Sequence, residues 1–438
     1  MKTTKSGAAM CAVSLFSGGG LGDFAIENGL RIPVIASCEL LPDRASLLRE
    51  NYPDTRVFEG DIYENIDDIV TCSQIRLNKK RPWLVVLSPP CQGMSSNGLG
   101  RINKAKTQGK RPQTDVRNRL LLPGLEVATK LQPDVILFEN VAGMVRAEIE
   151  VEGVQKKLLS IISENLDSEY IVKACVMQVA DYGVPHRRER LITIAVRKNV
   201  CPCVQDGIIL CNTSILHATP THKAHITINR SIGDLEELDA LKYRQSQTDA
   251  LHRVPKWTDW QYFCMKHTPE GKTAFDNMTC IVCNTAATNK ADLFCVCGEA
   301  LPRPRKLCKL WECDECNTTN KDKCCEKANH VATHKLIRAF KTSYKRMRSD
   351  GVASTLTTNS GVISSDVKGH PTQHRVLSLR ELLILSSLQL CSENEKDVSW
   401  EKEYKVPESD TLLRHVVGEG IPPLFLYKLL AHLRVMTT

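Results

Sequence analysis

Short apolar runs alternate with amphipathic stretches over the first 200 residues, and this alternation constrains the fold more than any other feature of the chain. The apolar runs, each about the length of one strand, are Val13–Phe16, Val34–Ser37, Trp83–Leu87, Val135–Phe138, Tyr170–Val176 and Leu191–Val196. The amphipathic stretches between them are Asp43–Asn51, Leu120–Leu131 and Val151–Asn165. Strands separated by helical patterns favour a mostly parallel sheet with helices on both faces. We therefore predict an α/β fold.

The sequence changes in character after about residue 200. Residues 201–372 are rich in Cys, Thr, His, Lys and Asn and show little periodicity, whereas a helical pattern returns from Arg375. The chain ends on an amphipathic stretch, 423–435, which a pair of prolines precedes as a favourable helix start. We predict one α/β domain that a smaller, irregular, cysteine-rich domain either follows or interrupts, the latter leaving residues 1–200 and 373–438 to the α/β domain.

Length and composition exclude several classes of protein. With 438 residues, of which 42% are apolar and 25% charged, the chain has the make-up of an ordinary globular protein of two or three domains. Its apolar runs fall short of the ~18 residues that a membrane span needs, and its start shows no signal-peptide pattern. We expect no membrane partner, and a location in the cytoplasm, associated with the nucleoid, if the source is prokaryotic or viral, or in the nucleus if it is eukaryotic.

Positive charge is concentrated in one segment. The net charge is +8, and residues 301–350 hold 13 Lys and Arg against 6 Asp and Glu. Such a segment suits a phosphate backbone, which makes nucleic acid a candidate partner. A solvated basic face would have the same composition, so charge alone leaves both interpretations open.

A cysteine follows the third apolar run on a turn that two prolines stiffen. The segment reads Ser88-Pro89-Pro90-Cys91 and continues to Ser95. Proline fixes φ, so Cys91 is held in one direction. Because ligands of open α/β sheets bind outside the carboxyl ends of the strands, a thiol at this place is a candidate nucleophile. The alternative is a small buried hydrophobic residue, the common state of a free cysteine.

Glycines follow the first apolar run, in the segment from Phe16 to Asp23. Glycines between a first strand and a helix allow a cofactor to approach the backbone closely. Glu39 follows the second strand about 20 residues later, where a carboxylate can bind ribose hydroxyls, and Asp61 follows a short apolar pair. The pattern predicts a nucleoside cofactor and leaves nicotinamide and adenosylmethionine open.

Two further segments at strand ends carry charge. Glu139, within Glu139–Val141, ends the fourth apolar run and could act as an acid or only interact with a helix N-terminus. Arg188 and Arg190 lead into the last run and, being two residues apart, are expected on one side of a strand. Guanidinium groups bind carbonyls, carboxylates and phosphates, although a surface charge run would look the same.

Taken in this order, the segments resemble the motifs of the cytosine-5 DNA methyltransferase family. The matching segments are Phe16–Gly22, Pro89–Gln92, Glu139–Val141, the pair Arg188 and Arg190, Arg375–Glu381 and Gly418–Pro423. The resemblance covers residues 11–200 and 370–438. It implies a Rossmann-like methyltransferase domain, a smaller irregular target-recognition domain at 201–372, and S-adenosylmethionine as the cofactor.

The resemblance also implies a set of site residues. The cofactor would bind at Phe16, Gly18, Gly20, Leu21, Glu39, Asp61, Ile62, Pro90, Glu419 and Gly420. The catalytic residues would be Cys91, Glu139, Arg188 and Arg190. Residues 94–118 would form a mobile loop that closes on DNA and contacts its phosphates.

The reaction that the family implies is covalent catalysis. The Cys91 thiolate would attack C6 of a cytosine flipped out of the duplex, while Glu139 would contact N3 and the exocyclic amine. The two arginines would help to hold the base and Glu139. C5 would then accept the methyl group, and loss of the C5 proton would free the enzyme.

Three positions depart from the family pattern. His186 stands where glutamine is usual, Glu419 where asparagine is usual, and Gly420 where a small residue with a side chain is common. His186 and Glu419 are expected near the base or the cofactor, where they could alter binding. None of these departures removes a residue with a covalent role.

Ten cysteines crowd one stretch of the second domain. Two C-x2-C pairs, Cys280 with Cys283 and Cys313 with Cys316, suit tetrahedral zinc because both thiolates reach one ion from a tight turn. We predict a zinc-binding insert at 264–334 with one or two structural Zn²⁺ ions, and free thiols are the alternative. The candidate ligands are Cys280, Cys283, Cys295, Cys297, Cys313, Cys316, Cys324 and Cys325.

We predict a DNA (cytosine-5)-methyltransferase that acts on double-stranded DNA as a monomer, with a cognate restriction endonuclease as a candidate partner. One alternative is an RNA cytosine-5 methyltransferase of the tRNA-methylating branch. The recognition region of that branch is small, whereas this one has about 170 residues, which favours DNA. A second alternative is a catalytically silent DNA-binding relative, and the presence of Cys91, Glu139 and Arg190 argues against it.

Overall fold

The computed structural model describes residues 3–4, 7–90, 116–202, 204–205, 208–209, 216–313, 328–337, 342–394 and 398–438. These residues form two compact units. Unit 1 is made of the described residues within 1–234, 355–358 and 382–438, and unit 2 of those within 235–354 and 359–381. The chain enters unit 2 twice, because the short segment Thr355–Thr358 returns to unit 1.

Unit 1 extends beyond residue 200, where the change in composition placed the first boundary. Leu216 and Ala218 pack into an apolar cluster with residues of the sheet, and the helix α7 (Ile228–Ile232) follows them before unit 2 begins. The final return to unit 1 comes at Leu382 instead of residue 373. At both boundaries the amino-acid composition changes before the chain passes from one unit to the other. The predicted boundaries therefore come earlier in the sequence than the observed ones.

Unit 1 is built on a seven-stranded sheet with the order β3-β2-β1-β4-β5-β9-β8. Its strands are β1 (Ala9–Leu15), β2 (Val34–Glu39), β3 (Arg56–Glu59), β4 (Pro82–Leu87), β5 (Val135–Val141), β8 (Tyr170–Gln178) and β9 (Glu189–Arg197). Neighbouring strands from β3 to β5 pair in parallel, whereas β9 pairs antiparallel with both β5 and β8. The predicted α/β fold with a mostly parallel sheet is confirmed.

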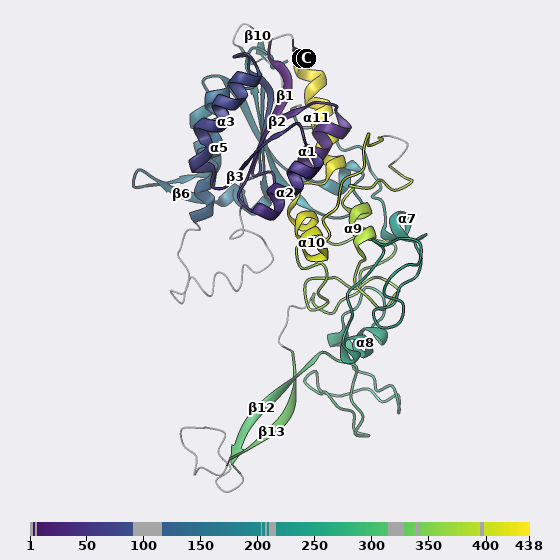
Figure 1. Ribbon diagram of the computed structural model, residues 1–438. Coiled ribbons are helices and arrows are strands. Elements are labelled where there is room, and N and C mark those ends of the chain that lie inside the picture. The colour runs from purple at the N-terminus through teal and green to yellow at the C-terminus, as the bar shows by residue number, and fades with distance from the viewer. Residues whose placement is uncertain are drawn as a thin grey trace. The chain divides into compact units, whose positions relative to one another are not determined.

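Helices cover both faces of this sheet (Figure 1). One face carries α3 (Ile62–Arg76), α5 (Leu121–Leu131) and α6 (Leu158–Leu166). The other carries α1 (Leu21–Phe24), the π-helix η1 (Ala25–Gly29) and α11 (Pro423–Thr437). Because neither face meets water, β2 and β4 bury every residue, and β4 appears in the sequence as a continuous apolar run. The helix α2 (Pro42–Asn51) contacts β2 and β3.

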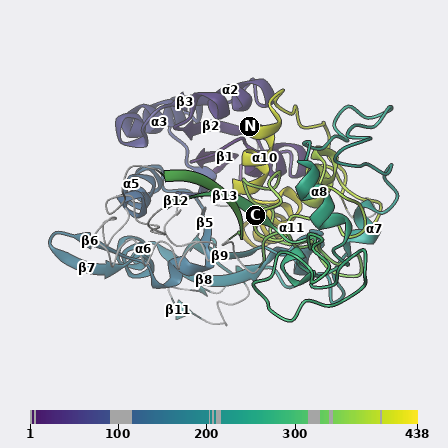
Figure 2. The ribbon, with the colours of Figure 1, turned by 90° about the horizontal axis from the view of Figure 1, so that it is seen from below.

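The helix predicted for Val151–Asn165 is wrong in its first half. A hairpin of β6 (Glu148–Val151) and β7 (Val154–Lys157) precedes α6. Glu152 and Gly153 form its turn with φ values of 52° and 78°, and such left-handed residues interrupt a helix. The hairpin projects away from the sheet in both ribbon views (Figure 1, Figure 2).

Three helices complete the C-terminal part of the chain. They are α9 (Leu379–Leu385), α10 (Asp410–Glu419) and the predicted terminal helix, α11. The indole Nε1 of Trp83 on β4 donates a hydrogen bond of 2.9 Å to Oγ1 of Thr437, which fastens α11 to the sheet. The remaining short elements of unit 1 are the 3-10 turns η2 (Val116–Leu120), η3 (Ala142–Arg146) and η4 (Val179–Tyr182) and the strands β10 (Val204–Gln205) and β11 (Ile208–Ile209). Among the described residues, no helix has the length and apolar character of a membrane span.

Unit 2 has little regular structure. Its elements are α8 (Asp259–Lys266), the 3-10 turn η6 (Ala274–Asp276), β12 (Arg305–Cys313) and β13 (Ala328–Leu336). β12 and β13 pair antiparallel as a long hairpin (Figure 1). A capping box of Thr258 and Gln261 starts α8, which contributes to a small core with Trp257 and Tyr344.

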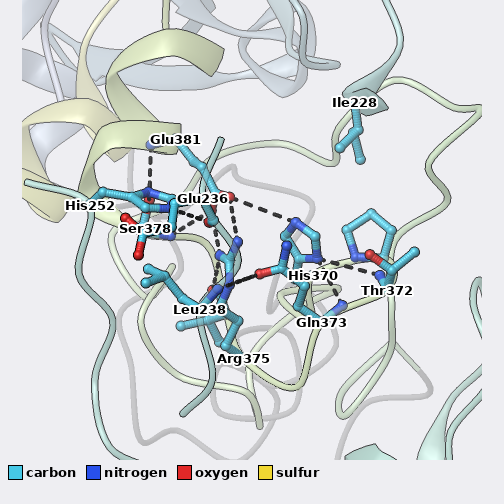
Figure 3. A network of polar contacts seen from close by, with 12 residues as sticks. Ile228, Glu236, Leu238, His252, His370, Thr372, Gln373, Arg375, Ser378 and Glu381 are labelled. Atoms are coloured by element: carbon cyan, nitrogen blue, oxygen red, sulfur yellow. Dashed lines mark hydrogen bonds and ion pairs between the residues drawn. The ribbon is translucent and has the colours of Figure 1, made fainter. Parts of the chain in front are cut away.

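A buried ion pair organises the segment Arg375–Glu381 of unit 2. The Arg375 guanidinium donates to both carboxylate oxygens of Glu381, each at 2.7 Å, and both side chains are fully buried (Figure 3). Gln373 Oε1 accepts from Arg375 Nε, and the backbone N–H of Ser378 donates to Glu381. Although burial acts to raise it, the charge of Arg375 lowers the pKa of Glu381 to about 2. This family motif therefore holds the end of unit 2 together.

A second buried arginine, Arg346, binds the irregular backbone of unit 2. Its guanidinium donates to the carbonyl oxygens of Met265 and Thr268, both at 2.7 Å, and to those of His370 at 2.9 Å and Gln373. Backbone outside helices and sheets needs other hydrogen-bond partners when it is buried. Arg346 supplies them where regular elements do not.

Candidate active site and metal site

The carboxyl ends of four parallel strands meet at one edge of the sheet in unit 1. Leu15 of β1 lies opposite Cys38 of β2 and Leu87 of β4, and Leu87 lies opposite Phe138 of β5. The strand order reverses at β1, which has β2 on one side and β4 on the other. Ligands of open α/β sheets bind at such a switch point. The motifs that follow these strands therefore lie together.

The glycine loop, defined as Phe16–Gly20, joins β1 to α1 with left-handed backbone angles. Phe16, Gly18 and Gly20 have φ values of 60°, 56° and 81°. A Cβ at Gly20 would lie 2.5 Å from the ring of Tyr52, so packing excludes a side chain there. A Cβ at Gly18 would meet nothing within 4 Å. The backbone at Gly18 thus faces open space, as a loop that cradles a cofactor requires.

Glu39, at the end of β2, is tied to this loop. Its Oε2 accepts a hydrogen bond of 2.8 Å from the N–H of Gly18, and Oε1 accepts one of 3.0 Å from Leu41. Burial raises the pKa of Glu39, and these two N–H groups oppose the rise. A carboxylate has four lone-pair sites, so Glu39 can still accept hydrogen bonds from ribose hydroxyls.

The other predicted cofactor residues near the sheet differ in exposure. Asp61 caps α3, because its carboxylate accepts a hydrogen bond of 3.0 Å from the N–H of Tyr63, and it is exposed. Leu21 and Ile62 are buried at the first positions of α1 and α3. Both helices therefore begin at this edge of the sheet with an apolar anchor.

The last motif reaches the same loop from the C-terminal part of the chain. Glu419 ends α10, and its carboxylate lies 2.7 Å from the guanidinium of Arg44 on α2. A Cβ at Gly420 would lie 2.7 Å from the side chain of Leu21. The structure thus brings Glu419 and Gly420 beside the glycine loop, although about 400 residues separate them from it in the sequence.

The predicted nucleophile, Cys91, lies outside the described residues, as do residues 94–115 of the predicted DNA-closing loop. The turn that leads to Cys91 is described as far as Pro90. Its Pro89 carbonyl accepts a hydrogen bond of 3.2 Å from Nδ2 of Asn140, which follows Glu139 on β5. The Pro-Cys and Glu-Asn-Val motifs are therefore joined directly.

Glu139 pairs with Arg190. Oε1 of Glu139 lies 2.7 Å from Nε of Arg190, and neither side chain is more than 12% exposed. The antiparallel register of β5 and β9 allows this pair. Arg190 stands opposite Val141, and Glu139 lies two residues before Val141 on β5, so the Glu139 and Arg190 side chains are on the same face of the sheet. The guanidinium fixes the direction of a carboxylate that would otherwise be free to rotate.

Arg188 and Arg190 have different hydrogen-bond partners. It precedes β9, where the alternation of a strand does not yet apply, and it is buried. Its guanidinium donates to the carbonyl oxygens of Leu356 at 3.2 Å and of Gly418 and Glu419 at 2.8 Å. The Glu139 carboxylate, in turn, pairs with Nε of Arg190.

His186, the first departure from the family pattern, is a buried packing residue. Its Nδ1 lies 2.7 Å from the carbonyl oxygen of Leu385, so Nδ1 carries the proton and donates. Only 1% of the residue is exposed. The substitution joins the segment before β9 to the end of α9.

Four cysteines of unit 2 converge on one point. The Sγ atoms of Cys280, Cys283, Cys295 and Cys297 all lie within 4.8 Å of one another, with Cys283 and Cys295 3.4 Å apart and Cys280 and Cys297 3.6 Å apart. Tetrahedral thiolates around zinc are about 3.8 Å apart, because each Zn–S bond is about 2.3 Å long. The cluster fits a zinc ion.

The other four candidate ligands are Cys313, Cys316, Cys324 and Cys325. The side chain of Cys313, the last residue of β12, is not described, and Cys316, Cys324 and Cys325 lie outside the described residues. The cluster itself combines one predicted C-x2-C pair, Cys280 with Cys283, with the C-x-C pair of Cys295 and Cys297.

Arg303 fastens the cysteine cluster to α8, and no sequence motif indicates this residue. The buried guanidinium donates to the carbonyl oxygens of Phe275 at 2.8 Å, Lys290 at 2.7 Å and Asp292. The Arg303 carbonyl accepts from the indole of Trp260 at 3.0 Å. The cluster is therefore held by backbone contacts on both sides of the second cysteine pair.

Comparison with known proteins identifies the class. The chain matches the family described as C-5 cytosine-specific DNA methylase over residues 10–434, and it belongs to that family. The type II methyltransferase M1.HgaI of Avibacterium volantium is 27% identical over 436 residues, which cover 94% of this chain and 95% of that protein. The type II methyltransferase M.AquIA of Picosynechococcus sp. is 32% identical over 193 residues, 42% of this chain and 71% of that protein.

Two solved structures share the fold. A putative DNA modification methyltransferase encoded within a prophage (E. coli) has a TM-score of 0.54 and 16% identity, covering 98% of this chain and 99% of that chain. A DNMT2 variant of Spodoptera frugiperda has a TM-score of 0.52 and 15% identity, covering 97% and 100%. At these identities the likeness shows the fold alone. The family match makes the protein a DNA cytosine-5-methyltransferase, as the motifs predicted.

Proposed function

We propose that this enzyme transfers a methyl group from S-adenosylmethionine to C5 of a cytosine that is flipped out of a specific duplex sequence. The observation that carries the proposal is the Glu139–Arg190 pair, which a hydrogen bond from Asn140 to Pro89 places beside the turn that leads to Cys91. A base inside the duplex cannot be reached by a thiol and a carboxylate together, so the cytosine has to leave the stack.

The cofactor would be held by the glycine loop and Glu39, with the backbone at Gly18 facing the ligand. Asp61 would add a second carboxylate, and Glu419 and Gly420 would close the site from α10. When bound, S-adenosylmethionine supplies an electrophilic methyl group. Glu39 and the loop orient it and keep it at the switch point of the sheet.

The proposed chemistry on the base uses three residues of this chain. The Cys91 thiolate forms a bond to C6, and the C5–C6 π pair shifts away from C6 and is shared between C5 and N3, so that C5 becomes nucleophilic. Glu139 contacts N3 and the exocyclic amine, and Arg190 holds Glu139 in direction. Once C5 carries the methyl group, removal of the C5 proton restores the double bond and expels the Cys91 thiolate.

Transfer of labelled methyl groups tests this proposal. Wild-type protein, labelled S-adenosylmethionine and either duplex DNA or tRNA are combined, with Cys91→Ala as the control. We expect transfer to duplex DNA that Cys91→Ala abolishes. Transfer to tRNA alone would favour the RNA alternative, and transfer to neither would indicate a silent DNA-binding relative. Bisulfite sequencing of DNA from cells that express the protein would then identify the modified sequence.

We propose that the cluster of Cys280, Cys283, Cys295 and Cys297 binds one structural Zn²⁺ ion. The ion would tie two short loops of unit 2 together where little apolar core is available. Metal analysis of purified protein should find about one zinc per chain from this cluster. Cys283→Ser should lower that content, whereas Cys175→Ser, at an exposed free cysteine of β8, should not.

We propose that the enzyme works as a monomer in a restriction-modification system, within the bacterial cytoplasm that holds the DNA. The type II methyltransferases among its relatives support this role. A cognate endonuclease would cut the same sequence unless it is methylated. Light scattering should give the mass of one chain, and a dimer mass would contradict the monomer.

A further inference from the structure

An ion pair joins distant parts of unit 1 beside the glycine loop. Nη2 of Arg44 on α2 lies 2.7 Å from Oε2 of Glu419, the last residue of α10. The Arg44 side chain is 8% exposed, whereas that of Glu419 is 41% exposed. Glu419 replaces the usual asparagine of the family pattern. The negative charge at position 419 therefore departs from the family pattern, and Arg44 is its partner in this chain.

The neighbouring backbone shows which segments the pair joins. A Cβ at Gly420 would lie 2.7 Å from Leu21, the first residue of α1. A Cβ at Gly19 would collide with Val416 of α10, and the hydroxyl of Tyr404 donates to the Gly19 carbonyl. The end of α10 and the glycine loop thus pack without room for a side chain between them.

Arg188 holds the same turn by its backbone. Its guanidinium donates to the carbonyls of Gly418 and Glu419, each at 2.8 Å. The last carbonyls of a helix have no partner within the helix, and a buried cation satisfies them. Arg44 binds the Glu419 side chain, and Arg188 binds the backbone carbonyls of Gly418 and Glu419. Together the two arginines fix residues 418–420.

Arg44 also separates two carboxylates electrostatically. Burial raises the pKa of Glu39. The N–H groups of Leu41 and Gly18 and the charge of Arg44 lower this pKa, whereas the charge of Glu419 raises it. Glu39 and Glu419 therefore repel each other across the site, and Arg44 offsets that repulsion. Loss of the Arg44 charge would push the turn away from the loop.

We propose that Arg44 and Glu419 are positioning residues for the cofactor, and that their ion pair holds residues 418–420 against the glycine loop and thereby sets the affinity for S-adenosylmethionine. This inference rests on the cofactor site of the proposed function. Neither residue has to touch the reacting atoms. The pair therefore controls cofactor binding and leaves the chemical step unchanged.

The test compares single and exchanged charges in the full-length protein. The variants are Arg44→Gln, Glu419→Gln, Arg44→Lys and the exchange of Arg44→Glu with Glu419→Arg. Arg49→Gln is the matched control, because Arg49 on the same helix pairs with Glu59 at 2.9 Å but is half exposed. The measurements are the Kd for S-adenosylmethionine by calorimetry without DNA, the KM for each substrate, kcat and the melting temperature.

We expect Arg44→Gln and Glu419→Gln to raise the Kd and the KM for S-adenosylmethionine by about fivefold, the effect of losing one partly exposed ion pair. The KM for DNA and kcat should stay within about twofold of wild type. Arg44→Lys should lose less, and the charge exchange should recover part of the affinity. Glu419→Gln, at a side chain in contact with solvent, keeps the test meaningful if an Arg44 variant is unstable.

Unchanged cofactor affinity in both single variants, an equal loss in Arg49→Gln, or a loss confined to kcat would overturn the proposal. Glu39→Ala separates this result from failure of the cofactor site itself. If Glu39→Ala binds S-adenosylmethionine normally, the site is wrong. If Glu39→Ala loses binding while the ion-pair variants keep it, the role of Arg44 and Glu419 is wrong and the site stands.

Discussion

Arg188 and Arg190 are separated by one residue and have different partners. Arg190 pairs with the Glu139 carboxylate, whereas Arg188 is surrounded by carbonyl oxygens, two of which come from the end of α10. A guanidinium beside a strand-end carboxylate can act on a bound base, while one that serves several carbonyls holds backbone in place. The same substitution at the two positions should therefore have different effects.

We predict that Arg190→Lys lowers kcat by roughly tenfold or more and leaves the Kd for S-adenosylmethionine unchanged, because an ammonium keeps the charge but not the direction of Nε. Arg188→Lys should instead raise that Kd and lower the melting temperature, because one ammonium cannot replace a planar group that binds three carbonyls. Steady-state kinetics and calorimetry measure both. Matching profiles for the two variants would contradict the assignment.

Two buried titratable residues should give opposite pH dependences of stability. Burial, with the charge of Arg375, lowers the pKa of His370 to about 3 from an ordinary value of 6.5. The unfolded chain then binds the proton more strongly, so stability is full above about pH 6.5 and is lost as pH falls toward 3. His370→Asn should flatten this loss by on the order of 1 kcal/mol, as read from urea midpoints between pH 7 and 4.

Asp23, buried on α1 and bonded to Ser37, behaves in the opposite sense. Burial raises its pKa from 3.8 to about 7. The folded protein then binds the proton more strongly, so this contribution to stability is lost as pH rises from about 4 through 7. Asp23→Asn should therefore be more stable than wild type at pH 8 and gain less at pH 5. The exposed control Asp67→Asn should show no such trend, and a parallel trend would contradict the assignment.

At the scale of elements, the glycine loop shows two reasons for glycine at neighbouring positions. Both Gly18 and Gly20 have left-handed φ values, but only Gly20 lacks room for a Cβ, since the Tyr52 ring lies 2.5 Å away. Tyr52 also donates a hydrogen bond of 2.6 Å to the Gly20 carbonyl. Gly20 therefore packs the loop against Tyr52, while the backbone at Gly18 stays open to a ligand.

We predict that Gly20→Ala destabilises the fold by about 2–4 kcal/mol, the sum of backbone strain and overpacking. Gly18→Ala should cost only about 1 kcal/mol, yet weaken S-adenosylmethionine binding because its Cβ enters the open space beside the backbone. Thermal unfolding and calorimetry separate the two effects. A Gly18→Ala variant that binds the cofactor normally would place the ligand elsewhere.

The elements that sequence predicts well are those with one possible environment. β4 is apolar throughout and β2 is buried throughout because both faces of the sheet are covered, and both strands were found where the pattern placed them. The β6–β7 hairpin was missed because Val151, Val154 and Leu158 recur at a spacing that also fits one face of a helix, and only the turn angles decide. The order of motifs identified the family, but the Glu139–Arg190 pair depends on strand register, and Arg44 and Arg303 carry no motif. Such contacts arise from tertiary packing, which local sequence does not encode.

At the scale of the whole molecule, the two units differ in what stabilises them. Unit 1 has a continuous apolar core on each face of its sheet, whereas unit 2 combines a small apolar core with buried arginines, the Arg375–Glu381 ion pair and the cysteine cluster. Metal binding to such a cluster is coupled to folding of the residues around it. The units should therefore respond differently to loss of metal.

We predict that a zinc chelator lowers DNA binding and methyl transfer by at least about tenfold while S-adenosylmethionine binding is retained, because the proposed metal would stabilise unit 2 and the proposed cofactor residues belong to unit 1. Gel shift assays, methyl-transfer assays and calorimetry before and after chelation test this. Re-addition of Zn²⁺ should restore activity in wild type but not in Cys283→Ser. Activity that is indifferent to chelation would show that the cluster has no metal-dependent role.

The segment Thr355–Thr358 has a consequence for building hybrid enzymes. It belongs to unit 1, although the residues on both sides of it belong to unit 2, and it is held there by a hydrogen bond from Thr355 to the Arg187 carbonyl and by close packing against Gly418. Exchanging residues 235–381 as one cassette would import a foreign copy of these four residues into the recipient's framework. A successful graft should therefore be cut into two pieces, 235–354 and 359–381, with the recipient's own residues kept between them.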